Sequence, residues 1–377
     1  MTTQPRPAGA PALVTVGGVS GSRAARRPED LERLAHLAEA AWAVDGNAER
    51  AIRFAVASAG TLPQPGSGHT TALFDALATV AAADLTAARV LEAHTDALAI
   101  LQQAPGGTAE AVATLPASRR SERSSWGVFA AEGPGLRVDA TRSRGDWRLS
   151  GRKPWCSLAG SLSHALVTAH TTPEGQQPGS RRLFAVDLAV AGVTVLEDAW
   201  FATGLNQVPS GPVDFADVPA VPVGDDGWYL TRPGFSWGGI QVAACWWGGA
   251  VGVARQLRRA AERKEPDQIL LAQLGAVDLA LLGAGSALAD AAAAIDRGEA
   301  AGDAGGLLAA RARGLVARTV DEVLGRVGHA LGPAPLALDA RHARRVADLT
   351  LYVRQHHAER DDAALGGRLL TGAAASW

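Results

Sequence analysis

Apolar residues recur with helical spacing through the first quarter of the chain. In PEDLERLAHLAEAAWAVDG they place Leu31, Leu34 and Leu37 on one face, with acidic residues in the first turn and Gly46 just past the end. This is the pattern of an amphipathic helix with its start and stop signals. The same spacing predicts a second helix near residues 48–59 and one or two more between residues 70 and 103.

The pattern changes after residue 104 to short runs rich in β-branched and aromatic residues, separated by Gly, Pro, Asp and Ser. Runs such as HALVTAHT have the length and composition of strands, and VDATRSRGDWRLSG is typical of a hairpin with an RGD turn. Helical spacing returns after residue 234. It predicts four helices, near residues 236–264, 266–297, 306–331 and 342–370.

Helices, then strands, then helices in separate blocks indicate an α+β fold and not a doubly wound α/β sheet. The predicted organisation begins with a flexible tail over residues 1–27, which contains a short ordered piece at ALVTV. Three domains follow: an N-terminal helical domain (28–120), a central β domain (121–229) and a C-terminal helical domain (230–377).

Composition narrows the class of protein. Apolar residues make up 47% of the chain, enough for a sizeable core, and the formal net charge of −2 gives no basic surface for nucleic acid. Two cysteines cannot form a disulfide framework, and they favour a reducing, cytoplasmic location. The chain starts without a signal-peptide pattern, and its apolar stretches are too short or too interrupted to predict a membrane span.

Three stretches of the strand-rich block carry a family resemblance. WGVFAAEGPG (126–135), LSGRKPWCSLAG (149–160) and DFADVPAVPVG (214–224) resemble, in this order and spacing, three motifs of the acyl-CoA dehydrogenase superfamily. The helical stretch DLTAARVLEAHTDALAIL resembles the N-terminal helices of its divergent members. The resemblance spans residues 28–370. It implies a central β-barrel or sandwich, a C-terminal four-helix bundle, and a flavin enzyme that uses FAD.

The resemblance also implies which residues contact the flavin. The family's Trp, which forms a flat wall for the ring, corresponds to Trp155, and its hydroxyl donor corresponds to Ser157. Such contacts set the electronic properties of the cofactor. The full implied set of cofactor-binding residues is Phe129, Ala131, Glu132, Trp155, Cys156, Ser157, Arg263 and Gln273. The last two correspond to residues that reach the FAD of a neighbouring subunit.

Several positions depart from the family pattern. Ala131 replaces a flavin-contacting Thr, GLR replaces GSD after Glu132, and the Phe between Arg263 and Gln273 is missing. A Gly-rich turn before the last helices is present only as GRVGHALGPAP. These departures open the question of how tightly, and in which mode, FAD binds.

The stretch HHAERD near the C-terminus holds the candidate acid/base. Where many members of the family have a catalytic glutamate in a Tyr-Glu-Gly context, this chain has Gln355, His356 and His357. The oxygen-using branch, the flavin monooxygenases, has a histidine in this region, which favours His356. Imidazole titrates near neutral pH, and Glu359, three residues on over the same helical face, is expected to orient its ring. The alternative is a solvated helix face. Adjacent histidines point about 100° apart on a helix, so no metal site is expected.

Two classes of function remain open. The first is a flavin-dependent oxidoreductase of lipid metabolism, which dehydrogenates an acyl thioester such as an acyl-CoA by hydride transfer to FAD. Its electrons would pass to an electron-transfer flavoprotein or to oxygen, and a monooxygenase on the same fold is the variant reaction. The second is a non-catalytic relative whose flavin site has decayed. The resemblance and the apolar stretch FSWGGIQVAACWWGGAVG predict a homodimer or homotetramer.

Overall fold

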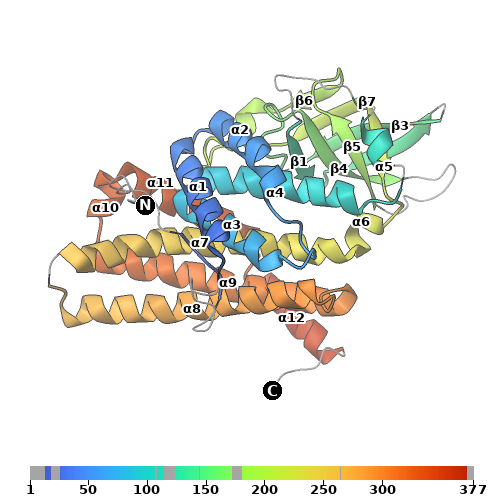
Figure 1. The fold of residues 1–377 in the computed structure, drawn as a ribbon. Helices are drawn as coiled ribbons and strands as arrows, with labels where there is room; N and C mark the ends of the chain where they lie inside the picture. Colours follow the sequence, from blue (N-terminus) through green and yellow to red (C-terminus); the bar gives the residue numbers. More distant parts are fainter. Residues whose placement is uncertain are drawn as a thin grey trace.

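Three blocks follow one another along the chain, and the predicted α+β order is confirmed (Figure 1). The computed structural model describes residues 13–17, 26–106, 108–113, 115, 124–143, 145–171, 181–263 and 265–371. The N-terminal helices are α1 (Pro28–Val44), α2 (Ala48–Ser58), α3 (Thr70–Ala83), α4 (Leu85–Gln103) and α5 (Thr108–Ala113), with the 3-10 helix η2 (Ala59–Thr61) after α2.

A sharp corner at Asp84 sets the position of α4. The Asp84 carboxylate caps α4 by accepting a hydrogen bond from the Ala87 amide (2.9 Å), and it also accepts one from the Gly46 amide (2.8 Å). An aspartate at this position satisfies amide groups that have no partner within the helix. The corner places α4 in contact with both strand β1 and helix α7, as Figure 1 shows.

The strands close on themselves into a barrel. They are β1 (Trp126–Phe129), β2 (Val138–Ser143), β3 (Asp146–Lys153), β4 (His164–Thr171), β5 (Arg181–Asp187), β6 (Val193–Val195) and β7 (Val213–Val223). Pairing runs from β4 through β2, β3, β7 and β5 back to β4, while β1 extends one edge of β4 and β6 pairs with β7. The predicted hairpin is present because β2 pairs antiparallel with β3. Arg144, in its turn, lies outside the described residues.

Helices of very different length form the third block. They are α6 (Trp228–Thr231), α7 (Pro233–Arg263), α8 (Gln268–Asp296), α9 (Gly302–Leu331), α10 (Ala334–Leu338), α11 (Ala340–Tyr352), the 3-10 helix η4 (Val353–Gln355) and α12 (Glu359–Leu370). Helix α7 is central and contacts α3, α4, α8, α9 and α11. The blocks meet between α5 and β1 and between β7 and α6. The domain limits at residues 120 and 229 themselves stay predictions.

Glycines let α7 approach α3 closely. A Cβ atom on Gly248 would overlap the carbonyl oxygen of Ala78, and one on Gly252 would lie 3.0 Å from that of Ala82. Backbone atoms cannot move aside as a flexible side chain can, so the contact between the two helices depends on these glycines.

The apolar stretch in α7 is part of the interior, and the prediction that it forms a subunit interface was wrong. Trp246 and Cys245 have no exposed surface. A helix that has neighbours on every side is apolar all round, so the apolar residues of this stretch belong to the core. Phe235, at the start of the stretch, is 42% exposed, and further exposed apolar side chains lie on α8, at Ile269, Leu271 and Leu279. Among the described residues, α8 alone has the length and mean hydropathy, 1.6, of a possible membrane span.

Residues 13–17 pack into the core beside α3. The Val16 amide donates to the Asp75 carboxylate (2.6 Å), and the Val14 amide donates to the Thr79 hydroxyl (3.1 Å). The Arg26 guanidinium also binds Asp75, at 2.6 Å. The rest of the predicted tail, residues 1–12 and 18–25, lies outside the described residues.

The predicted continuous helix over residues 342–370 was wrong. Helix α11 ends at Tyr352, and α12 begins only at Glu359, after Ala358 with a φ of 48°. The Asp361 carboxylate accepts a hydrogen bond from the His357 amide (3.0 Å). The acidic run of ERDD therefore starts a new helix, where negative charges offset the partial positive charge of the helix N-terminus.

Candidate functional site

A pocket between α4 and β1 brings together two of the predicted cofactor residues, Phe129 and Ser157. It is lined by Arg89, Val90, Ala93, Trp126, Gly127, Val128, Phe129, Ser157, Leu158, Leu162 and Val208. The lining is apolar except for the guanidinium of Arg89 and the hydroxyl of Ser157. An apolar pocket with a few polar groups is the common form of a small-molecule site.

The loop after β3 turns Trp155 outward and Cys156 inward. Trp155 has a φ of 58° and its side chain is 60% exposed, an unusual combination for a bulky residue. The Cys156 amide donates to the Gly211 carbonyl (3.0 Å), and its thiol contacts the Lys153 carbonyl (3.3 Å). Both polar groups of Cys156 thus hold the loop in place, and its role toward FAD stays a prediction. Burial raises the pKa of the thiol to about 12, so Cys156 stays protonated.

A chain of hydrogen bonds connects Ser157 to a buried carboxylate. The Arg89 guanidinium donates to the Ser157 hydroxyl through Nη2 (3.1 Å) and to Glu92 Oε2 through Nη1 (3.1 Å). The Tyr352 hydroxyl donates to the same Glu92 oxygen (3.4 Å), and the Ser157 and Ser210 hydroxyls lie 2.8 Å apart. The loop of the flavin motif, α4 and α11 are therefore joined at one place.

Burial controls the protonation of this centre. Glu92 is 5% exposed, and loss of hydration raises its pKa to about 7, against the opposing effect of Arg89. The pKa of Asp96, one turn further along α4, is raised for the same reason. Burial also raises the pKa values of Tyr352 and Cys245 well above their ordinary range. Glu92 is therefore able to hold or release a proton at neutral pH.

Two more arginines surround the centre. Arg232 lies 3.6 Å from Asp96 and donates to the side chain of Gln103 (2.6 Å). Arg313 stacks on the ring of Trp246 at 4.7 Å and donates to the carbonyls of Gly239 (2.9 Å) and Gln355 (3.2 Å). Arg313 therefore connects α9, α7 and the end of η4.

His356 and Glu359 do not line the pocket beside Ser157. His356 is 7% exposed; its Nδ1 accepts from the Ala358 amide (3.2 Å) and its Nε2 lies 3.7 Å from Asp361. Glu359 is exposed and makes no contact with His356 that the described residues show, because the chain turns between the two. The expectation that Glu359 orients the ring was wrong; Asp361 has that position. A catalytic role for His356 stays a prediction.

The remaining predicted cofactor residues lie apart from the pocket. Ala131 and Glu132 are exposed after β1, and Glu132 pairs with His170 (2.9 Å) and Arg181 (3.4 Å). Arg263 is exposed at the end of α7. Gln273 on α8 accepts a hydrogen bond from Arg326 (2.9 Å). Their roles toward FAD stay predictions.

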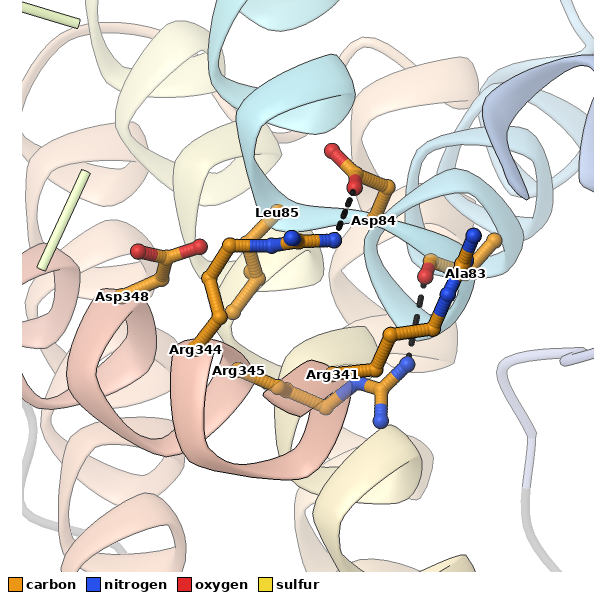
Figure 2. A pocket seen from close by; sticks show the side chains of 7 residues that line it. All are labelled: Ala83, Asp84, Leu85, Arg341, Arg344, Arg345 and Asp348. Carbon is orange, nitrogen blue, oxygen red and sulfur yellow. Dashed lines mark hydrogen bonds and ion pairs between the residues drawn. The ribbon is translucent and has the colours of Figure 1, made fainter. Parts of the chain in front are cut away.

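A second pocket lies where α11 meets the corner between α3 and α4. Figure 2 shows Arg341, Arg344 and Arg345 reaching from α11 toward this corner. Arg344 pairs with Asp45 (2.7 Å) and Asp84 (3.6 Å). Each arginine has a partner, because Arg341 also pairs with Asp45 (3.2 Å) and Arg345 donates to the carbonyls at residues 82 and 83. These contacts fasten the helices together.

The sequence reading missed Arg89, Glu92, Asp96 and Tyr352. Arg89, Glu92 and Asp96 recur at spacings of three and four residues within an apolar helix, so they share one face. This spacing could have indicated a shared site, although charged residues on a solvated helix face show the same spacing. Among the described residues, no group of three or more His, Cys, Asp and Glu side chains could hold a metal ion.

Comparison with known proteins agrees with this architecture. The family described as "Acyl-CoA dehydrogenase, middle domain" matches residues 130–218. The acyl-CoA dehydrogenase FadE34 of Mycobacterium tuberculosis is 30% identical over 125 residues. This match covers 31% of the chain and 18% of FadE34, so the chain spans less than a fifth of that relative.

Solved structures match over nearly the whole chain. TdsC from Paenibacillus sp. A11-2, in complex with FMN and indole, is 19% identical with a TM-score of 0.72, covering 91% of this chain and 97% of TdsC. Its structure is also described as a dibenzothiophene monooxygenase. Butyryl-CoA dehydrogenase from Megasphaera elsdenii is 16% identical with a TM-score of 0.75, covering 92% and 99%.

The chain therefore has the acyl-CoA dehydrogenase fold, which some relatives use for dehydrogenation and others for oxygenation. Residues 130–218 match the acyl-CoA dehydrogenase middle domain, so over this part the chain resembles the acyl-CoA dehydrogenase superfamily. The resemblance drawn from the three sequence motifs is confirmed.

Proposed function

We propose that this protein is a flavin-dependent oxidoreductase whose proton-transfer group is Glu92. The observation that carries the proposal is the hydrogen-bonded chain from Ser157 through Arg89 to Glu92, because it joins the loop of the flavin motif to a buried acid. Catalytic groups with pKa values near the working pH are typical of active sites.

The residues around Trp155 fit a flat aromatic cofactor. Trp155, which is 60% exposed, stands just before Ser157 in the sequence, and Ser157 is one of the residues that line the apolar pocket. Trp155 would support the ring of a flavin, and Ser157, Phe129 and the backbone of β1 would meet its edge. When bound, a flavin would supply a two-electron acceptor. FAD is the cofactor expected from the family. FMN is the alternative, since the TdsC complex holds FMN and this chain lacks the family's GSD and Phe.

Each side chain of the centre has a distinct task in this proposal. Glu92, which is bonded to Arg89 and is not among the residues that line the pocket, is proposed to take up the proton that a substrate loses when its neighbouring C–H bond is oxidised. Arg89 would keep the Glu92 carboxylate and the Ser157 hydroxyl at fixed positions, and Tyr352 would donate a second hydrogen bond to the same Glu92 oxygen. The apolar lining, which includes Leu158 and Leu162, would exclude water.

The first candidate reaction is α,β-dehydrogenation of an acyl thioester, such as an acyl-CoA, with an electron-transfer flavoprotein or oxygen as the acceptor. Glu92 would be the base that removes the α-proton, and His356 is the alternative base expected from the resemblance. The enzyme is proposed to be cytoplasmic and homo-oligomeric, with the exposed apolar side chains of α8 in the subunit contact.

The second candidate is oxygenation on the same fold. It is favoured by the likeness to TdsC, whose complex holds FMN and indole, and by the aromatic and branched side chains of Trp126, Leu162 and Val208 in the pocket wall. A non-catalytic relative is less well supported. Glu92 and Arg232 are buried charged residues. Replacing buried charges with apolar residues often stabilises a protein even when the charges are paired, so their presence favours a functional use.

Two tryptophan variants test the cofactor site. Trp155→Ala is expected to lose most of the flavin that the parent retains through purification, because it removes the exposed flat surface. Trp147→Ala is the control, since Trp147 lies within β3, before the loop that carries Trp155, and packs against Phe184 (5.3 Å) away from the pocket. Flavin content is read from absorbance after desalting. Equal flavin content in the two variants would contradict the assignment of Trp155.

A further inference from the structure

The guanidinium of Arg89 is a cation in the wall of an otherwise apolar pocket. Its side chain is 15% exposed, and of its five N–H donors two have partners among the described residues, Glu92 and Ser157. The remaining donors are able to meet a ligand in the pocket. Because this pocket is the proposed active site, the inference below rests on the proposed function.

The charges around Arg89 leave an excess of positive charge. In the part of the chain that the structure describes, the buried centre contains Arg89, Arg232 and Arg313 against the carboxylates of Glu92 and Asp96. Tyr352 and Cys245 also face the centre, but burial keeps both protonated. The nearest further carboxylate is Asp361, which is one third exposed and is shared with His356 and His357.

An unbalanced cation in a poorly hydrated site is costly, and an anion that enters the site lowers this cost. A planar carboxylate matches the guanidinium, since its two oxygens accept two parallel N–H bonds. The Ser157 hydroxyl accepts from Nη2 of Arg89 (3.1 Å) and lies 2.8 Å from the Ser210 hydroxyl, which itself donates to the Val208 carbonyl, so Ser157 meets a carboxylate by turning its one hydrogen away from Ser210. The apolar residues Val90, Phe129 and Leu158 line the rest of the pocket.

We propose that the substrate is a compact molecule with an apolar body and one carboxylate, and that Arg89 and Ser157 bind this carboxylate. The carboxylate is a recognition group and is not itself oxidised. The reacting C–H bond belongs to the apolar body, so the same recognition serves either candidate reaction. A long unbranched acyl chain without a second polar group does not satisfy Arg89.

Carboxylate binding is coupled to protonation of Glu92. Both anions compete for Arg89, so a bound carboxylate favours the protonated form of Glu92. Burial already raises the pKa of Glu92 to about 7, and Asp96 on α4 acts in the same direction. Arg313 on α9 and Arg89 oppose the shift. Affinity for a carboxylate is therefore expected to rise as the pH falls from about 8 to about 6, with uptake of a proton.

Three probes of similar shape test the proposal by calorimetry on the full-length protein: benzoate, benzamide and benzylammonium. Benzoate is expected to bind roughly 10- to 100-fold more tightly than benzamide, the usual advantage of a charge-assisted hydrogen bond. Benzylammonium is expected not to bind. The affinity for benzoate, but not for benzamide, is expected to increase at pH 6. Equal affinities for benzoate and benzamide would overturn the proposal.

Substitutions at Arg89 and Ser157 test whether these two residues bind the carboxylate. Arg89→Met is expected to reduce the benzoate affinity to that of benzamide, and Ser157→Ala to weaken it less. The control is Arg258→Met, which removes an exposed arginine paired with Glu262 on α7 and is expected to change nothing. If Arg89→Met does not fold, the probe series on the parent protein still decides. Benzoate binding unaffected by Arg89→Met would overturn the proposal.

Measurements with and without flavin separate this inference from the proposed function. Benzoate is expected to bind to the flavin-loaded protein and to perturb the flavin absorption spectrum. Benzoate could instead bind only to the flavin-free protein and be displaced when flavin is added. The pocket would then be the cofactor site, and the carboxylate inference would fail while the proposed function stands. Binding to a protein that accepts no flavin would leave the carboxylate site and overturn the oxidoreductase assignment.

Discussion

Glu92→Gln tests whether the buried acid at the centre of the site holds a proton near neutral pH. Burial raises the pKa of Glu92 from 4.5 to about 7. Each unit of pKa corresponds to about 1.4 kcal/mol, so the carboxylate costs the folded protein about 3 kcal/mol once it is ionised. This is a net figure, because the favourable effect of Arg89 already lowers the pKa.

The direction of the pH effect follows from proton binding. Between about pH 4.5 and 7 the unfolded chain has lost a proton that the folded protein keeps, so the contribution of Glu92 to stability falls as the pH rises through this window. Glutamine does not ionise. Glu92→Gln should therefore resemble the parent at pH 5 and gain about 3 kcal/mol relative to it at pH 8.

Urea unfolding followed by tryptophan fluorescence measures this difference at the two pH values. Glu262→Gln is the control, since Glu262 is exposed on α7 and pairs only with Arg258 in the described structure. The free-energy difference between Glu92→Gln and the parent should depend on pH, and that for Glu262→Gln should not. A constant difference for Glu92→Gln would show that Glu92 is ionised throughout, and the acid/base role proposed for it would fail.

Three further changes test other parts of the account. Gly248→Ala should destabilise the fold by about 1–3 kcal/mol or more, because its Cβ would overlap the Ala78 carbonyl; thermal unfolding measures it. Once a substrate is known, Glu92→Gln should slow flavin reduction by roughly 10²–10⁴-fold and His356→Ala by less than tenfold, and the reverse order in stopped-flow experiments would restore His356 as the base. Ala358→Gly should raise the free energy of unfolding by about 1 kcal/mol, because glycine relieves the φ of 48°; a lower melting temperature would contradict this.

The order of helices and strands was predictable because the spacing of apolar residues differs between them. The break between the two helices at HHAERD was not predictable, since nothing in the sequence indicates the positive φ of Ala358. The acidic run in ERDD was a usable signal for a new helix. The apolar stretch of α7 was assigned to an interface because sequence alone does not show how many neighbours a helix has.

The site was predictable only in part. Phe129 and Ser157 belong to sequence motifs and the structure places both in one pocket, while the flavin contacts expected of them and of Trp155 stay predictions. Arg89 and Glu92 were missed because charged residues at helical spacing usually mark a solvated face. Only the packing of α7 and α11 against α4 shows that this face is buried, and so makes Glu92 a candidate for proton transfer.

The visible absorption spectrum of the purified protein tests the central claim most directly. The protein is incubated with FAD or FMN, desalted and scanned, and dithionite is then added. The proposed function predicts the absorption bands of a bound flavin, which bleach on reduction, with Trp155→Ala depleted of flavin. A folded protein that retains neither flavin after desalting would contradict the assignment as a flavin-dependent oxidoreductase.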